Sequence, residues 1–262
     1  MPQGFHYGAQ PVPEGHHSTA EYATPKEKTN LMTKTFMYFG LALLITLIVN
    51  VVASLIFKYA FPITSGDVVN DENAMAYIVT LIVSGIIVLI MTFVLNFAFL
   101  GAKSKRNVFL APYIIYAVAM GVLLSGLTLF VEWYVLAIAL GITVVSFGIM
   151  ILIGINVKKG INVIALVAMS LGISLLMISL FWFIWFLLLP ALFNWLYVAV
   201  SFGYLIFMYL ITIIDVYRIK KASEQGVTSN NLALYFAYQL YVDFIYILIR
   251  IILLILKLTN KR

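Results

Sequence analysis

The chain has 262 residues, of which 64% are apolar and only 10% are charged, and its mean hydropathy is +1.08. These values exclude an ordinary soluble globular protein and predict a membrane protein with several spans. The formal net charge is +6, but the Lys and Arg residues fall at the ends of apolar segments, so we exclude nucleic acid as a partner. The absence of cysteine excludes disulfides, thiol catalysis and cysteine-bound metals.

Residues 1–30 carry four of the seven prolines and all three histidines, together with scattered charges. Such a segment cannot bury a core, so we predict a disordered cytoplasmic tail. Its histidines, His6, His16 and His17, would have no fixed geometry for a metal site. Residues 31–262 form the predicted transmembrane domain.

Long apolar runs fill this domain. A helix needs about 20 apolar residues to cross a bilayer, and the runs are continuous where the strands of a barrel would alternate. The predicted fold class is therefore all-α, a polytopic bundle of seven transmembrane helices. The predicted segments are 34–57, 74–100, 108–130, 134–157, 161–189, 191–215 and 232–256.

The charges between the segments alternate in sign, which predicts a cytoplasmic N-terminus. Basic residues mark the inner side and acidic residues the outer side: Lys26, Lys28, Lys34, Lys103, Lys105, Arg106, Lys158, Lys159, Arg218, Lys220 and Lys221 against Asp67, Asp71, Glu72 and Glu132. Seven crossings leave the C-terminus outside, although Lys257, Lys261 and Arg262 there oppose the positive-inside rule. A re-entrant last segment is the alternative to a full seventh span.

Two local patterns predict packing and membrane anchoring. The aromatic run FWFIWF at 181–186 falls at the expected outer end of the fifth segment, where such rings favour the interface. In the third segment, Ala117, Gly121 and Ser125 repeat every four residues, which allows a neighbouring helix to approach closely.

Only two of the ten acidic residues fall within the predicted segments: Asp215 at the cytoplasmic end of the sixth and Asp243 near the middle of the seventh. An acid at the bilayer centre costs about 2.5–3.5 kcal/mol, so it usually has a partner and a function. Each acid lies on a polar stripe at helical spacing, and lipid cannot satisfy such a stripe. The stripes are Ser201, Tyr204, Thr212 and Asp215, and Gln239, Asp243, Tyr246 and Arg250.

The connection between the two acids allows them to meet. We predict a helix end in KASEQGVTSN, a turn around Gly226 and Val227, and a cap at Ser229 or Asn230. Counted from Val227, Asp215 is 12 residues back and Asp243 is 16 residues forward. The mismatch in an antiparallel hairpin is about 6 Å, which modest tilt can close.

Two carboxylates in a poorly solvated site are expected to titrate as one coupled unit, which makes a proton-responsive latch. When ionised, Asp215 and Asp243 offer the hard oxygen ligands that suit Ca²⁺, so proton and cation would compete. The structural alternative is that Asp243 pairs statically with Arg250 or a tyrosine hydroxyl and only fixes the helix register.

The chain resembles the Bax inhibitor-1 family, also called the transmembrane Bax inhibitor motif family. IIDVYRIKKASE is similar to its penultimate-helix motif, NLALYFAYQLYVDFIYILIRII to its last-helix motif, and YAVAMGVLLSGL at 116–127 to its third helix. The resemblance implies a bundle around a central last helix, in which Asp215 and Asp243 form a pH-sensing pair that gates a calcium leak. It also implies roles in cell death or as a partner of a membrane-anchored protease.

Two positions depart from the family pattern. Bacterial relatives can carry a basic residue on the second helix that latches onto the acid pair, whereas the second segment here offers Asn96 and small hydroxyls. Tyr246 stands where relatives often have Asn. The resemblance therefore predicts the pH-sensing acid pair, whereas the contact that closes the gate is expected to differ from that of the relatives.

We predict a pH-sensitive calcium leak channel with no cofactor and no enzymatic activity. An intramembrane aspartyl protease would also use two acids, but Leu-Tyr-Val precedes Asp243 where those enzymes have a Gly-x-Gly motif, and no other catalytic motif is present. The alternative function is a non-channel regulator that binds a membrane protease or stress partner. The cysteine-free chain with compact loops favours a bacterial plasma membrane.

Overall fold

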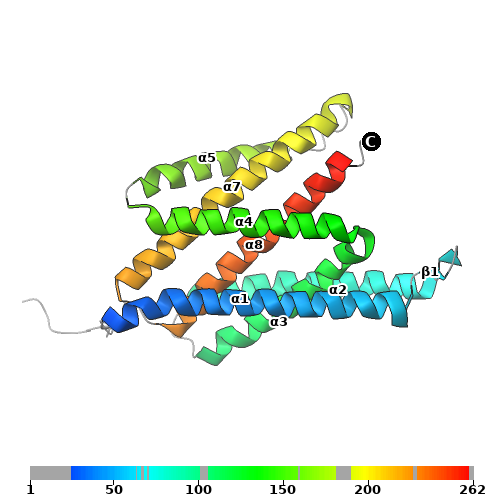
Figure 1. Ribbon diagram of the computed structural model, residues 1–262, viewed down its shortest axis with the longest axis horizontal. Helices are drawn as coiled ribbons and strands as arrows, with labels where there is room; N and C mark the ends of the chain where they lie inside the picture. The colour runs from blue at the N-terminus through cyan, green and yellow to red at the C-terminus, as the bar shows by residue number, and fades with distance from the viewer. Residues whose placement is uncertain are drawn as a thin grey trace, which may run out of the picture.

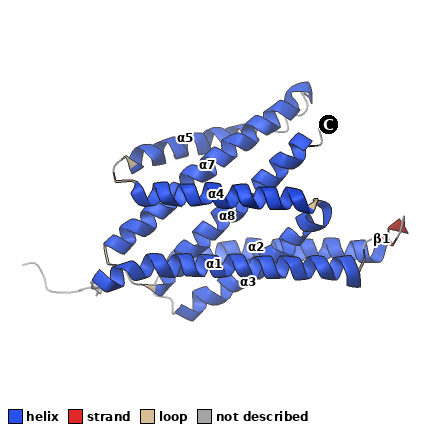
Figure 2. Ribbon diagram, in the orientation of Figure 1, coloured by secondary structure: helices blue, strands red, loops and turns tan. Residues whose placement is uncertain are grey.

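The computed structural model describes residues 25–62, 64–65, 68–69, 71–100, 106–158, 160–180, 190–226 and 229–259 (Figure 1). Almost all of them are helical, which confirms the all-α class (Figure 2). The α-helices are α1 (Pro25–Leu55), α2 (Asp71–Leu100), α3 (Arg106–Phe130), α4 (Trp133–Asn156), α5 (Ile161–Leu180), α7 (Pro190–Glu224) and α8 (Asn230–Thr259). A π-helical turn (Ile56–Ala60) and an antiparallel pair, β1 (Thr64–Ser65) with β2 (Val68–Val69), join α1 to α2.

The helices match the seven predicted segments, with differences at their ends. The helix α1 already begins at Pro25, and residues 1–24 of the predicted tail lie outside the described residues. The aromatic run 181–186 also lies outside them. The helix α7 continues past the predicted membrane segment 191–215 and ends at Glu224, within the stretch where the helix end is predicted.

Six helices of the described chain, α1 to α5 and α7, are long and apolar enough to cross a membrane. The seventh, α8, differs because it lies at the centre and packs against α1, α3, α4 and α7 (Figure 1). At 1.5 Å per residue, its unbroken run spans about 45 Å, and it contains no turn at which a re-entrant segment would reverse. A full crossing by α8 therefore remains our prediction.

The outer and central helices differ in which side chains they bury. The helices α2 and α5 expose most of their apolar side chains, as expected of surfaces in contact with lipid. By contrast, Ala233, Ala237, Leu240, Tyr241 and Ile247 of α8 are completely enclosed. The polar stripe of α8 explains this placement, since only a helix surrounded by other helices can keep polar groups away from lipid.

Aromatic rings hold α8 against its neighbours. Phe244 packs edge-on against Phe147 of α4 and Phe39 of α1, and these last two rings stack at 5.4 Å. About 60° further around α8, Tyr241 meets the rings of Tyr113 and Tyr116 of α3 at 6.2 and 5.8 Å. These contacts join α8 to three helices at one level.

Small residues on α3 allow α1 to approach closely, as predicted. A Cβ at Gly121 would lie 2.8 Å from the carbonyl oxygen of Thr46, so a larger residue would push the helices apart. The hydroxyl of Thr46 donates to the carbonyl oxygen of Ala117 at 3.1 Å and hydrogen-bonds with the Tyr241 hydroxyl at 2.6 Å. Ala117 and Ser125, the other two small residues of this repeat, are fully buried.

A similar close contact joins α4 to α7. A Cβ at Gly154 would lie 2.7 Å from Cβ of Val216 and 3.0 Å from the carbonyl oxygen of Ile213. Close by, the Lys220 ammonium donates to the carbonyl oxygen of Ile155 at 2.7 Å, in the last turn of α4. This bond satisfies one of the carbonyl groups left free at a helix C-terminus.

We predict that Gly154→Ala destabilises the protein by about 1–3 kcal/mol, because neither Val216 nor the α7 backbone can move aside without shifting the helix. The matched control is Gly148→Ala on the same helix, where a Cβ meets nothing within 4 Å. Unfolding of the purified protein in detergent, followed by circular dichroism, measures both. Equal stability of the two variants would contradict the α4–α7 contact.

Candidate functional site

The candidate site lies in the hairpin of α7 and α8, whose turn forms as predicted. The helix α7 ends at Glu224, and Gly226 has a φ of +77°, a conformation that glycine adopts readily. The Gly226 amide donates to the carbonyl oxygen of Ser223 at 3.1 Å, and the Ala233 amide donates to that of Ser229. Ser229 therefore occupies the cap position of α8.

Three cross-helix contacts fix how α7 and α8 are aligned. Thr212 contacts Asp243, the Arg250 guanidinium lies 4.6 Å from the centre of the Tyr204 ring, and the Lys257 ammonium lies 5.6 Å from that of Tyr197. From the first contact to the last, the residue number falls by 15 on α7 and rises by 14 on α8, as expected of two straight antiparallel helices.

This alignment agrees with the predicted offset between the acids. Thr212, which is level with Asp243, is 15 residues before Val227, whereas Asp243 is 16 residues after it. Asp215 is one helical turn further along α7, level with Gln239. The two acids therefore lie on facing helices, roughly one helical turn, about 5.4 Å, apart along the axis.

The carboxyl group of Asp243 is deeply buried, and its neighbours balance little of the negative charge it carries when ionised. Only 5% of its surface is exposed, and its Oδ2 accepts one hydrogen bond, from the Thr212 hydroxyl at 3.2 Å. That hydroxyl shares its single proton with the carbonyl oxygen of Met208, at 2.9 Å. Among the described residues, no Lys or Arg forms an ion pair with Asp243. A buried carboxylate without a cationic partner is costly, so this position favours a group that binds a proton or a cation.

Asp215 is equally buried but has a cationic partner. Its exposed fraction is 4%, and the Arg218 guanidinium donates to its Oδ1 at 3.1 Å. The side chain of Arg218 is 62% exposed, so the ion pair joins a buried acid to a cation at the protein surface. The spacing of three residues between Asp215 and Arg218 is a recognisable signal for a helical ion pair, in addition to the topology that Arg218 indicates.

A pocket of about 720 Å³ between α5 and α7 reaches Asp215. Asp215, Arg218 and Gln239 line it, whereas Asp243 does not. Gln239 donates from Nε2 to the Tyr235 hydroxyl at 3.2 Å, while its buried Oε1 has no hydrogen-bond donor in the described part of the chain. Asp215 is therefore the acid next to an opening, and Asp243 is the inner acid.

Other residues of the predicted polar set lie away from the acid pair. Tyr246 is 57% exposed, because three residues turn it about 60° around α8 from Asp243. Arg250 packs on Tyr204, so neither Arg250 nor a tyrosine hydroxyl pairs with Asp243 in the described structure. Asn96 is exposed on α2 and donates to the carbonyl oxygen of Thr92 on its own helix. It does not contact the acids.

A family model described as "Inhibitor of apoptosis-promoting Bax1" matches residues 28–261. The chain belongs to the Bax inhibitor-1 family. The match includes nearly all of α1 and both acid-bearing helices. Together with the apolar helices, membership makes this an integral membrane protein. No curated protein sequence matches the chain.

In this Bax inhibitor-1 family member, we predict that Thr212→Val lowers the free energy of unfolding by about 1–3 kcal/mol, because it leaves the Asp243 carboxyl group without its hydrogen-bond donor. The control is Thr143→Val, at an equally buried threonine whose hydroxyl bonds to Ala139 of its own helix. Denaturant unfolding in detergent measures both variants. A loss no larger than that of the control would show that the bond to Asp243 contributes nothing.

Proposed function

We propose that this protein is a pH-sensitive cation leak channel, with Ca²⁺ as the permeant ion and Asp215 and Asp243 as its gate. The observation that supports it best is the burial of two carboxyl groups about one helical turn apart on facing helices, of which Asp243 lacks a cationic partner in the described chain. Either a proton or a cation relieves such a site, so the two compete for it. This competition links ion passage to pH.

The oxygen atoms near the acids suit an ion that binds transiently during permeation better than one that is stably bound. Calcium takes six to eight oxygen ligands, and two carboxylates supply only part of that number. The Thr212 hydroxyl and the unpartnered Oε1 of Gln239 are further oxygens on the same helices. Within the described residues, no group of three or more His, Asp or Glu side chains could hold a resident metal.

The ion pair of Asp215 with Arg218 is the contact that we propose closes the gate. It replaces the basic latch on the second helix, since Asn96 lies elsewhere. Protonation of Asp215 removes its charge and weakens the bond, and the exposed Arg218 then moves into solvent at little cost.

We also propose that the N-terminus is cytoplasmic and that the membrane is a bacterial plasma membrane.

The test is Ca²⁺ flux through purified protein in liposomes between pH 5 and pH 8. Asp243→Asn and Asp215→Asn keep the shape of each acid but remove its charge, so we expect flux at every pH to match that of the wild type at low pH. Asp71→Asn, in the exposed first turn of α2, is the control and should retain the wild-type profile.

Two results would contradict the proposal. An unchanged pH profile in both variants would remove the acids from the gate. A wild-type protein without any leak would favour the alternative, a regulator that binds a membrane-anchored protease or a stress partner, with Asp243 as a structural anchor.

A further inference from the structure

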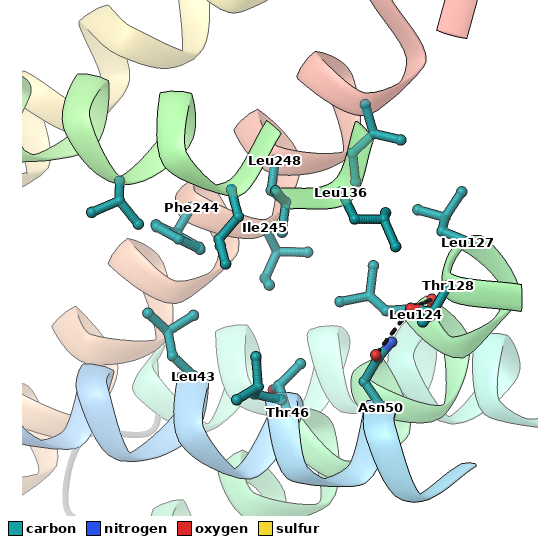
Figure 3. Close-up of a pocket in the computed structure, with 14 residues that line it drawn as sticks. Leu43, Thr46, Asn50, Leu124, Leu127, Thr128, Leu136, Phe244, Ile245 and Leu248 are labelled. Carbon is teal, nitrogen blue, oxygen red and sulfur yellow. Dashed lines mark hydrogen bonds between the residues drawn. The ribbon is translucent and has the colours of Figure 1, made fainter. Parts of the chain in front are cut away.

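Figure 3 shows a second pocket, of about 300 Å³. Its residues Phe244 and Leu248 lie about 140° and 180° around α8 from Gln239, which lines the pocket at Asp215. Four helices form it, and leucines predominate among its lining residues. They are Leu43, Thr46, Leu47 and Asn50 of α1, Leu124, Leu127 and Thr128 of α3, Leu136, Leu140 and Val144 of α4, and Phe244, Ile245, Leu248 and Ile252 of α8. Its volume is at the small end of the range for ligand sites.

The pocket has a closed end and an open side. The rings of Phe39, Phe147 and Phe244 join α1, α4 and α8 at one end, and Phe244 also lines the pocket. At the rim, Leu47 of α1 and Val144 of α4 are 57% and 53% exposed. Because the outer surfaces of α1 and α4 are apolar, as expected of spanning helices that face lipid, the pocket opens sideways toward acyl chains.

The other end of the pocket is polar. The Thr128 hydroxyl donates to Oδ1 of Asn50 at 3.0 Å, as the dashed line in Figure 3 shows. Within the described residues, the Asn50 amide group makes its hydrogen bond through its oxygen, and its nitrogen donates to no acceptor. The Thr46 hydroxyl is already occupied by Ala117 and Tyr241. The Asn50 amide is therefore the free donor of an otherwise apolar site, and an unpaired donor beside hydrocarbon is unfavourable.

The depth of the polar end matches the edge of the hydrocarbon layer. Thr128 is two residues before the end of α3 at Phe130, and α4 begins at Trp133, which is 79% exposed. Exposed tryptophans at helix ends mark the membrane interface. The ester groups of glycerolipids lie at this level, whereas Leu43 lies seven residues deeper on α1, about 10 Å away at 1.5 Å per residue.

We propose that this pocket binds one acyl chain of a bilayer phospholipid, with the ester carbonyl of that chain accepting a hydrogen bond from the Asn50 amide. The chain enters between α1 and α4 and runs along α8 toward Phe244. The bound acyl chain fills the pocket, so the lining side chains keep dispersion contacts that they would lose if the pocket were empty. The site shares α8 with the acid pair but does not depend on the proposed function.

The first experiment maps the bound chain on the wild-type protein. The protein is placed in phosphatidylcholine vesicles that contain a small share of phosphatidylcholine with a diazirine in mid-chain, irradiated, digested and analysed by mass spectrometry. We expect more adducts at Leu43, Leu136 and Leu248 than at Leu89 of α2, which is 58% exposed. If the adduct yield instead increased with the exposed fraction of each side chain, so that Leu89 gave the highest yield, the proposal would be overturned.

Two variants with matched controls test the two ends of the site. Leu248→Trp fills the pocket and should lower the yield at Leu43 and Leu136 several-fold, whereas Leu44→Trp, exposed on α1 outside the lining, should not. Asn50→Leu keeps the size and removes the donor, so the yield should fall roughly threefold to tenfold. Asn156→Leu, whose amide already bonds to Leu152, is its control.

Unchanged labelling in either pocket variant would overturn the proposal. So would loss of the adducts on adding oleic acid at a molar share far below that of the phospholipid, because a free fatty acid would then be the occupant. Circular dichroism of each variant confirms that its helices are intact before yields are compared.

Discussion

The burial of Asp243 in the middle of α8 is the constraint on which the rest of the structure depends. A carboxyl group at this depth cannot face lipid, so α8 must be enclosed by other helices. The enclosure is built from the aromatic contacts of Phe244 and Tyr241 and from the hydrogen bond of Thr212. The outer helices can be apolar on nearly every side because α8 carries the polar groups.

The helices could be predicted from sequence because each outer helix is a long, uninterrupted apolar run. The predicted membrane segment ends at Asp215 because its apolar run ends there, whereas the helix α7 continues through the polar stretch that follows, to the helix end predicted in KASEQGVTSN. That stretch remains helical because Lys, Ala and Glu are good helix formers, and because Lys220 and Arg218 find partners there. The pair β1 and β2 is too short for any periodicity to reveal it.

Part of the candidate site could also be predicted. Counting residues from the turn at Gly226 placed Asp215 and Asp243 one turn apart, because both helices rise by the same distance per residue. Helical spacing also placed Arg250 on the face of Asp243, but spacing cannot decide where a long side chain leans. Arg250 packs on Tyr204 of α7, and the shorter Thr212 reaches the acid.

The coupling of the two acids is the central claim, and infrared spectroscopy of protonated carboxyl groups tests it most directly. The carbonyl stretch would be followed between about pH 4 and pH 9 in bilayers, for the wild type, Asp215→Asn and Asp243→Asn. Our account predicts that removing either carboxylate changes the titration of the other. If the remaining acid in each variant titrated as it does in the wild type, the two groups would be independent, and the account of a shared gate would be contradicted.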